Sequence, residues 1–143
     1  MSTEQKNQYV EIITKDNFQE YAVFHDKYAI PSEMYYHSKN VQKEMERFLI
    51  LAYREHGVIH GSIVVKVAGE LAEIFAVFID EEYEHRGIET ILINEVIGTV
   101  YNEFSNIKEL IYFIDEDDPE ELNIVLNAGF VIEGRPRTYK CLL

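Results

Sequence analysis

The stretch with the most capacity for chemistry runs from Leu71 to Tyr101, where a strand, a polar loop and a helix follow one another. Its first part, Leu71 to Ile79, is a nearly unbroken apolar run, which is typical of a central strand covered on both faces. The acidic turn Asp80 to Glu84 and the tripeptide His85-Arg86-Gly87 come next, and from Ile88 apolar residues recur with a helical period. Because the first amides of a helix have no intrahelical partner, this corner can hold an anion.

Other strands and helices must hold this corner in place. Before it, short turns that contain glycine separate apolar segments, which is typical of an antiparallel meander. After the helix another apolar strand follows, and a strand–helix–strand order implies parallel pairing of the two strands. The predicted strands are Val10–Ile13, Phe48–Tyr53, Val58–Ala68, Leu71–Ile79, Lys108–Ile114, Phe130–Glu133 and Thr138–Leu142. The predicted helices are one that Asp16 or Asn17 caps and Pro31 stops, one at Asn40 to Arg47, one from Ile88, and one from Pro119 to Gly129.

Length and composition indicate one domain over residues 1–143, with residues 1–8 as a flexible N-terminus. The hydrophobic fraction of 47% excludes a disordered chain, and no apolar run approaches the roughly 20 residues of a membrane span. Cys141 is the single cysteine, so no internal disulfide can form. We therefore expect a cytoplasmic protein.

The balance of acidic and basic residues indicates which classes of ligand the surface attracts. Acidic residues outnumber basic ones by 26 to 13, which gives a formal net charge of −13. Such a surface repels nucleic acid and anionic membranes, and we expect neither as a partner. It favours cationic ligands such as amines, although solubility alone is the simpler explanation. The acidic cluster Asp115 to Glu121 lacks the spaced ligands and the glycine of a calcium loop, so we expect no metal site.

The loop before the central helix resembles the cofactor-binding motif of the GNAT superfamily of N-acetyltransferases. In that family an apolar strand leads into a loop of the form Gln/Arg-x-x-Gly-x-Gly/Ala and then a helix, and the loop amides hold the pyrophosphate of acetyl-CoA. Glu84, Gly87 and Glu89 stand at the three signature positions, so only Gly87 is retained.

Two further matches lie outside the loop. Glu73 precedes Arg86 by thirteen residues, as the general-base glutamate does in the histone-acetylating branch of the family. Asn127-Ala128-Gly129-Phe130 resembles the Leu-Gly-Phe ending of the family's second motif. The resemblance covers about residues 8 to 143 and implies an α/β (α+β) fold, with a mixed, mostly antiparallel central sheet of six to seven strands flanked by about four helices.

The resemblance also implies roles for particular residues. Acetyl transfer to an amine needs a base for the amine proton and a hydrogen-bond donor for the carbonyl oxygen. Glu73 would be the base, and strand amides near Val77 to Ile79 would be the donors. The linker between the first two helices lines the acceptor site in the family, so Tyr35, Tyr36 and His37 would touch substrate, or else cover the sheet edge. The residues expected to bind acetyl-CoA are Val77, Phe78, Ile79, Glu84, His85, Arg86, Gly87, Ile88, Glu89 and Thr90.

Departures from the family pattern leave two classes of function open. Glu84 and Glu89 place negative charge beside a phosphate-binding loop, and Val125 stands where many members have a tyrosine that protonates the leaving thiolate. Tyr83, Tyr112 and Tyr139 are available instead, but the sequence identifies none of them. We favour an N-acyltransferase that moves an acetyl group from acetyl-CoA to an amine, with a cationic acceptor. The alternative is a non-catalytic GNAT-fold protein that has lost efficient acetyl-CoA binding and serves as a binding or regulatory module, for which a homodimer is one arrangement.

Overall fold

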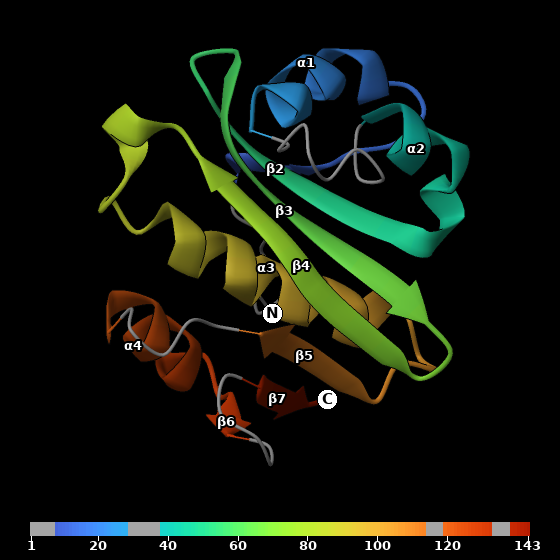
Figure 1. Cartoon of the computed structure of the whole chain (residues 1–143), viewed down its shortest axis with the longest axis vertical. Coiled ribbons are helices and arrows are strands. Elements are labelled where there is room, and N and C mark those ends of the chain that lie inside the picture. Colours follow the sequence, from blue (N-terminus) through green and yellow to red (C-terminus); the bar gives the residue numbers. More distant parts are fainter. Residues whose placement is uncertain (1–7, 29–37, 114–118, 133–137) are drawn as a thin grey trace.

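The chain folds around a seven-stranded sheet in the computed structural model, with the strand order β1-β2-β3-β4-β5-β7-β6 (Figure 1). The structure describes residues 8–28, 38–113, 119–132 and 138–143. The elements are β1 (Val10–Ile12), α1 (Phe18–Tyr28), α2 (Ser38–Lys43), the short 3-10 helix η3 (Met45–Arg47), β2 (Phe48–Glu55), β3 (Val58–Ala68), β4 (Leu71–Ile79), the 3-10 helix η4 (Glu81–Tyr83), α3 (Ile88–Glu103), β5 (Glu109–Phe113), α4 (Pro119–Asn127), β6 (Val131–Ile132) and β7 (Thr138–Leu142).

Strand pairing follows the predicted topology. β2, β3 and β4 form an antiparallel meander, and β4 pairs with β5 in parallel after the crossover through α3. The remaining pairs, β1 with β2, β5 with β7 and β6 with β7, are antiparallel. The mixed, mostly antiparallel sheet flanked by helices confirms the predicted fold class.

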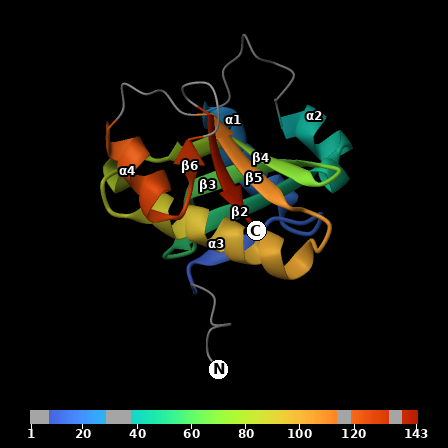
Figure 2. The same cartoon turned by 90° about the horizontal axis from the view of Figure 1, so that it is seen from below.

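The helices cover the sheet as two layers (Figures 1 and 2). Buried residues of α3 and α4, among them Leu92 and Val125, form one core with the sheet. On the opposite face Phe18 and Tyr21 of α1 and Val41 of α2 form a second core. Each core is made by the apolar stripe of its helices against one face of the strands. None of the helices in the described ranges is both long and apolar enough to cross a membrane.

The continuous second helix predicted at Asn40 to Arg47 is wrong. α2 ends at Lys43, and a separate 3-10 turn follows at Met45–Arg47. Glu44 between them has φ −123° and ψ 40°, outside the helical region, which breaks the helix. Other boundaries differ by a residue or two: β1 ends at Ile12, β2 continues to Glu55, β5 covers Glu109–Phe113 and β6 covers Val131–Ile132. The predicted end residues Pro31, Ile114 and Glu133 lie outside the described residues.

β4 contains an extra residue. The consecutive residues Val64 and Val65 of β3 pair with Ala76 and Ile74, so Phe75 has no opposite residue in the ladder. This arrangement is a β-bulge, which bends the strand and changes which way the following side chains point.

The bulge exchanges the two faces of β4. Ala72 and Ile74, before the bulge, belong to the core on the α3 side, and Val77 and Ile79, after it, pack against that same core. Strict alternation would have placed the two pairs on opposite faces. In the second half of β4 it is therefore the odd-numbered residues that face the α3 side, whereas in the first half it is the even-numbered ones.

Pairing between β4 and β5 also stops at this point. The described pairs join Leu71–Ile74 to Glu109–Tyr112, and Ile74 with Tyr112 is the last of them. Beyond it β4 pairs only with β3 among the described strands. Among the described residues, the second half of β4 therefore has a free edge toward β5, and this edge becomes one wall of the site.

Candidate functional site

A cleft of about 650 Å³ opens where β4 and β5 separate. Its walls come from the second half of β4, the loop and first turn of α3, the end of β5 and the first turn of α4. The lining residues are Tyr28, Ala76, Val77, Phe78, Ile79, Tyr83, Glu84, His85, Gly87, Ile88, Glu89, Thr90, Tyr112, Glu120, Glu121 and Ile124.

The free edge of β4 presents backbone amides to this cleft. The Asp80 amide donates to the His60 carbonyl at 2.8 Å, which fixes Asp80 with His60 as a hydrogen-bonded pair of the antiparallel ladder. Because such pairs alternate, the amides of Val77 and Ile79 point away from β3. Both residues line the cleft, so these two donors face it.

The first turn of α3 presents a second set of amides. Gly87 is the N-cap with φ 82°, and the first helical hydrogen bond runs from the Ile91 amide to the Gly87 carbonyl at 3.1 Å. The amides of Ile88, Glu89 and Thr90 therefore have no intrahelical acceptor. A left-handed conformation favours glycine, which accounts for the retention of Gly87.

Gly61 on β3 allows α3 to begin close to the sheet. A Cβ atom at Gly61 would lie 3.2 Å from Cγ2 of Ile88, the first residue of α3. That distance is tighter than most such contacts, so a larger residue at 61 would displace the helix start. Gly61 thus helps set the position of the amides at the helix N-terminus.

The side chains of the cleft are strongly acidic. Glu84, Glu89, Glu120 and Glu121 all line it. The Tyr112 hydroxyl donates to Glu121 at 2.7 Å and lies 3.5 Å from Glu89. Burial, and then these two carboxylates, raise the pKa of Tyr112 well above its ordinary value of 10. The phenol therefore stays protonated and remains a hydrogen-bond donor.

Asp80, directly after β4, joins three elements. Its carboxylate accepts hydrogen bonds from Lys27 Nζ at 3.0 Å, from His60 Nδ1 at 2.8 Å, and from the Tyr28 hydroxyl. Burial alone would raise the pKa of Asp80, but these donors outweigh it and hold the pKa below its ordinary value. Burial and the hydrogen bond to Asp80 raise the pKa of Tyr28 to about 12.

Two stacked aromatic rings connect Asp80 to the loop before α3. The His60 ring stacks on Tyr83, with centroids 3.9 Å apart and planes 14° apart. The Arg86 guanidinium lies 4.6 Å from the Tyr83 centroid. Asp80, His60, Tyr83 and Arg86 therefore form a connected set, which we call the loop column.

Most of the residues predicted to bind cofactor lie together in the structure. Nine of the ten line the cleft, and Arg86 is the exception because its side chain lies over Tyr83. Tyr28 and the glutamates of α4 also line the cleft but were not predicted as site residues, and Tyr112, one of the three tyrosines that the sequence left open, lies there as well. No sequence signal places them in the cleft, because tertiary packing alone brings α1, β5 and α4 to this point.

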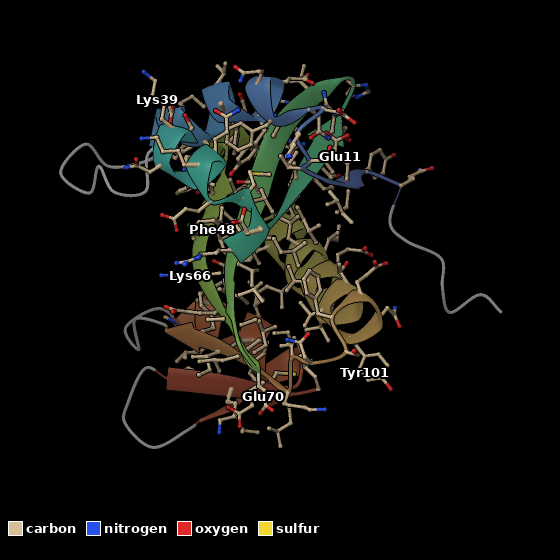
Figure 3. All side chains as sticks on the ribbon, turned by 90° about the vertical axis from the view of Figure 1, so that its right-hand side faces the viewer. Glu11, Lys39, Phe48, Lys66, Glu70 and Tyr101 are labelled. Atoms are coloured by element: carbon tan, nitrogen blue, oxygen red, sulfur yellow. The ribbon has the colours of Figure 1, made fainter. Side chains whose placement is uncertain are left out.

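Glu73 lies outside the residues that line the cleft. It stands between Ala72 and Ile74, which face the α3 side, so its side chain points to the opposite face. Its ladder partner on β3 is Lys66, which Figure 3 shows extending away from α3. Glu73 is half-buried and one residue before the last pair between β4 and β5. Its assignment as a base stays a prediction.

Other predicted positions fall elsewhere. Tyr35, Tyr36 and His37 lie outside the described residues. Val125 is fully buried in the core and does not line the cleft. Tyr139 is also buried in that core, whereas Tyr83 and Tyr112 line the cleft. In the described part of the chain no group of three or more His, Cys, Asp or Glu residues could hold a metal ion.

Comparisons with known proteins agree on one family. A model of the acetyltransferase (GNAT) family matches residues 9–125. A search of curated protein sequences finds no significant match.

Solved structures with the same fold include three acetyltransferases. PaiA N-acetyltransferase from Thermoplasma acidophilum, in complex with coenzyme A, is 14% identical with a TM-score of 0.69, over 94% of this chain and 99% of that chain. A GNAT family acetyltransferase from Elizabethkingia anophelis with acetyl-CoA bound is 16% identical with a TM-score of 0.65, over 96% and 100%. A mutant of spermidine N-acetyltransferase SpeG from Vibrio cholerae is 13% identical with a TM-score of 0.71, over 93% and 94%.

The three hydrogen bonds to Asp80 lead to a pH-dependent prediction. We expect Asp80→Asn to lower the free energy of unfolding by about 1–3 kcal/mol at pH 7, because three donors lose their charged acceptor. The folded-state pKa lies below the ordinary 3.8, so this contribution is full above that value and is lost as the pH falls through the folded-state pKa. Urea unfolding at pH 7 and at pH 3 measures the difference.

The control is Glu81→Gln, one residue further along, whose exposed side chain should change stability by less than about 0.5 kcal/mol. An Asp80→Asn effect of the same size at both pH values would contradict the assignment.

Proposed function

The chain belongs to the acetyltransferase (GNAT) family, and on that premise we propose that it is an N-acyltransferase that moves an acetyl group from acetyl-CoA to an amine. One observation carries the proposal: the cleft presents two sets of backbone amides, those of Val77 and Ile79 on β4 and those of the first turn of α3. Amides at a helix N-terminus suit a pyrophosphate. Amides on a free strand edge suit the oxygen of a thioester carbonyl.

The two faces of the sheet would receive the two substrates. The cofactor would lie along the α3 side, with its thioester in the gap between β4 and β5. The amine would approach from the opposite face, toward which Glu73 points. Its nitrogen would attack the carbonyl carbon, forming the C–N bond as the C–S bond breaks and leaves its electron pair on sulfur. Glu73, directly or through water, would take the proton that the amine loses.

The acceptor would be a cationic or primary amine. The net charge is −13, and a second hollow of about 520 Å³ at the end of β4 is lined by Asp80, Glu81 and Glu82 together with Lys27 and Tyr28. Charge of this sign attracts cations and repels carboxylates. One solved structure with this fold is a spermidine acetyltransferase, which acts on a polyamine.

The acidic lining of the cleft favours a second candidate function. Glu84, Glu89, Glu120 and Glu121 would all repel a polyphosphate, and the loop's Arg86 lies over Tyr83, outside the lining. A protein with this fold that has lost efficient acetyl-CoA binding would serve as a binding or regulatory module. Such a module is the alternative to the enzyme.

Calorimetric titration with acetyl-CoA tests the proposal, followed by a mass-spectrometric assay of acetyl transfer. The assay compares primary amines, polyamines and carboxylates at low and high salt. Binding with transfer to an amine supports the enzyme. Absence of binding at millimolar acetyl-CoA supports the module, and a preference for anionic acceptors would rule out the proposed acceptor class.

The role proposed for Glu73 predicts a specific kinetic effect. We expect Glu73→Gln to lower kcat by about 100-fold or more with little change in the Kd of acetyl-CoA, because only proton removal is impaired. Steady-state kinetics and calorimetry measure the two quantities. Glu70→Gln, in the exposed turn before β4, is the matched control and should leave both unchanged. Turnover unaffected by Glu73→Gln would remove Glu73 from the mechanism.

The two glutamates at the loop's signature positions predict a gain of function. We expect the double variant Glu84→Gln, Glu89→Gly to bind acetyl-CoA at least about tenfold more tightly, because two charges that repel the phosphates are gone. The gain should shrink at high salt. The introduced glycine costs about 1 kcal/mol of helix stability.

Glu103→Gln, in the last turn of α3, is the control for net charge alone. If wild type already binds at micromolar strength and the double variant binds no better, repulsion by these glutamates does not limit affinity.

A further inference from the structure

We propose that the loop column, Asp80, His60, Tyr83 and Arg86, holds the loop before α3 in the conformation that presents the helix amides, with Tyr83 as its central positioning residue. This inference rests on the proposed function, since the amides matter only if a phosphate-bearing ligand binds there. Only Gly87 of the three signature positions is retained in this loop. On this proposal, side-chain packing around Tyr83 holds the loop in position.

The loop backbone requires external support. His85 has φ 64° and Gly87 has φ 82°, so two of three consecutive residues adopt the left-handed region. Glycine does so at no steric cost, but histidine does not. The hydrogen bond between His85 Nδ1 and Glu120 is largely exposed at both ends, with side-chain exposures of 71% and 57%. Exposed pairs of this kind contribute little.

Tyr83 provides the support from the inner side of the loop. Its amide donates to the Asp80 carbonyl at 2.8 Å, which fixes the start of the turn. The centroid of its ring lies 3.9 Å from the centroid of the His60 ring and 4.6 Å from the Arg86 guanidinium carbon. Arg86 is bonded directly to Gly87, the N-cap of α3, so holding Arg86 on the ring restricts the backbone at the cap.

The base of the column is fixed. His60 belongs to β3, is only 17% exposed, and donates from Nδ1 to Asp80. Asp80 in turn accepts from Lys27 and Tyr28 at the end of α1. The ring on which Tyr83 stacks is therefore anchored to the sheet and, through Asp80, to α1.

The test compares Tyr83→Leu with its matched control Tyr83→Phe, which retains the stacking ring and loses only the hydroxyl. We expect Tyr83→Leu to raise the Kd of acetyl-CoA at least about tenfold, and Tyr83→Phe to change it less than about twofold. S-acetylpantetheine lacks the pyrophosphate, so Tyr83→Leu should lower kcat/KM for this donor by a smaller factor than it lowers kcat/KM for acetyl-CoA. A loss that is equal for the two donors, or a Tyr83→Leu variant that binds acetyl-CoA like wild type, would overturn the proposal.

A measurement without ligand separates this inference from the proposed function. Amide hydrogen exchange over residues 84–90 should be at least about tenfold faster in Tyr83→Leu than in Tyr83→Phe, with unchanged exchange in β3. Absence of acetyl-CoA binding in wild type, together with this exchange difference, would refute the proposed function and leave the column as a loop support. Equal exchange in the two variants would refute the column whatever the ligand result.

Discussion

Asp80 is the junction on which the site depends. It directly follows β4, and its carboxylate joins the last turn of α1 to a histidine of β3. The cleft needs all of these elements, because Tyr28, β4 and the loop each form part of its wall. One half-buried carboxylate with three donors fixes the relative positions of elements that strand pairing alone would leave adjustable.

The cleft combines two opposing tendencies. Its backbone offers amides from a helix N-terminus and from a free strand edge, which suit an anionic ligand. Its side chains include four carboxylates, which do not. Backbone amides follow from the fold and survive substitution, whereas side-chain charge is set residue by residue. The fold therefore keeps the backbone donors of a cofactor site, while the charges of the side chains determine how tightly the site would bind an anionic ligand.

Sequence patterns predicted the elements better than the contacts among them. The bounds of β3, β4 and β7 and the start of α3 were predicted correctly, because periodicity and turn residues are local signals. The GNAT family and nine residues of the cleft followed from the strand–loop–helix motif. His60 lies in β3, whereas Asp80 and Tyr83 lie in the turn after β4, and only the folded chain brings His60 to them. The sequence places His60 within a predicted strand but does not show what its ring contacts.

The bulge at Phe75 shows why the central strand carries so uniform a sequence. A strand with one face in contact with solvent alternates between apolar and polar residues. An extra residue shifts that alternation by one position. β4 is covered on both faces and is apolar at every position except Glu73, so the shift leaves no trace in the residue types around the bulge. Such a strand tolerates exchange of one apolar residue for another. Deletion of Phe75 would restore a regular ladder, with Val77 and Ile79 still on the α3 side, and would remove the bend at the point where β4 and β5 separate.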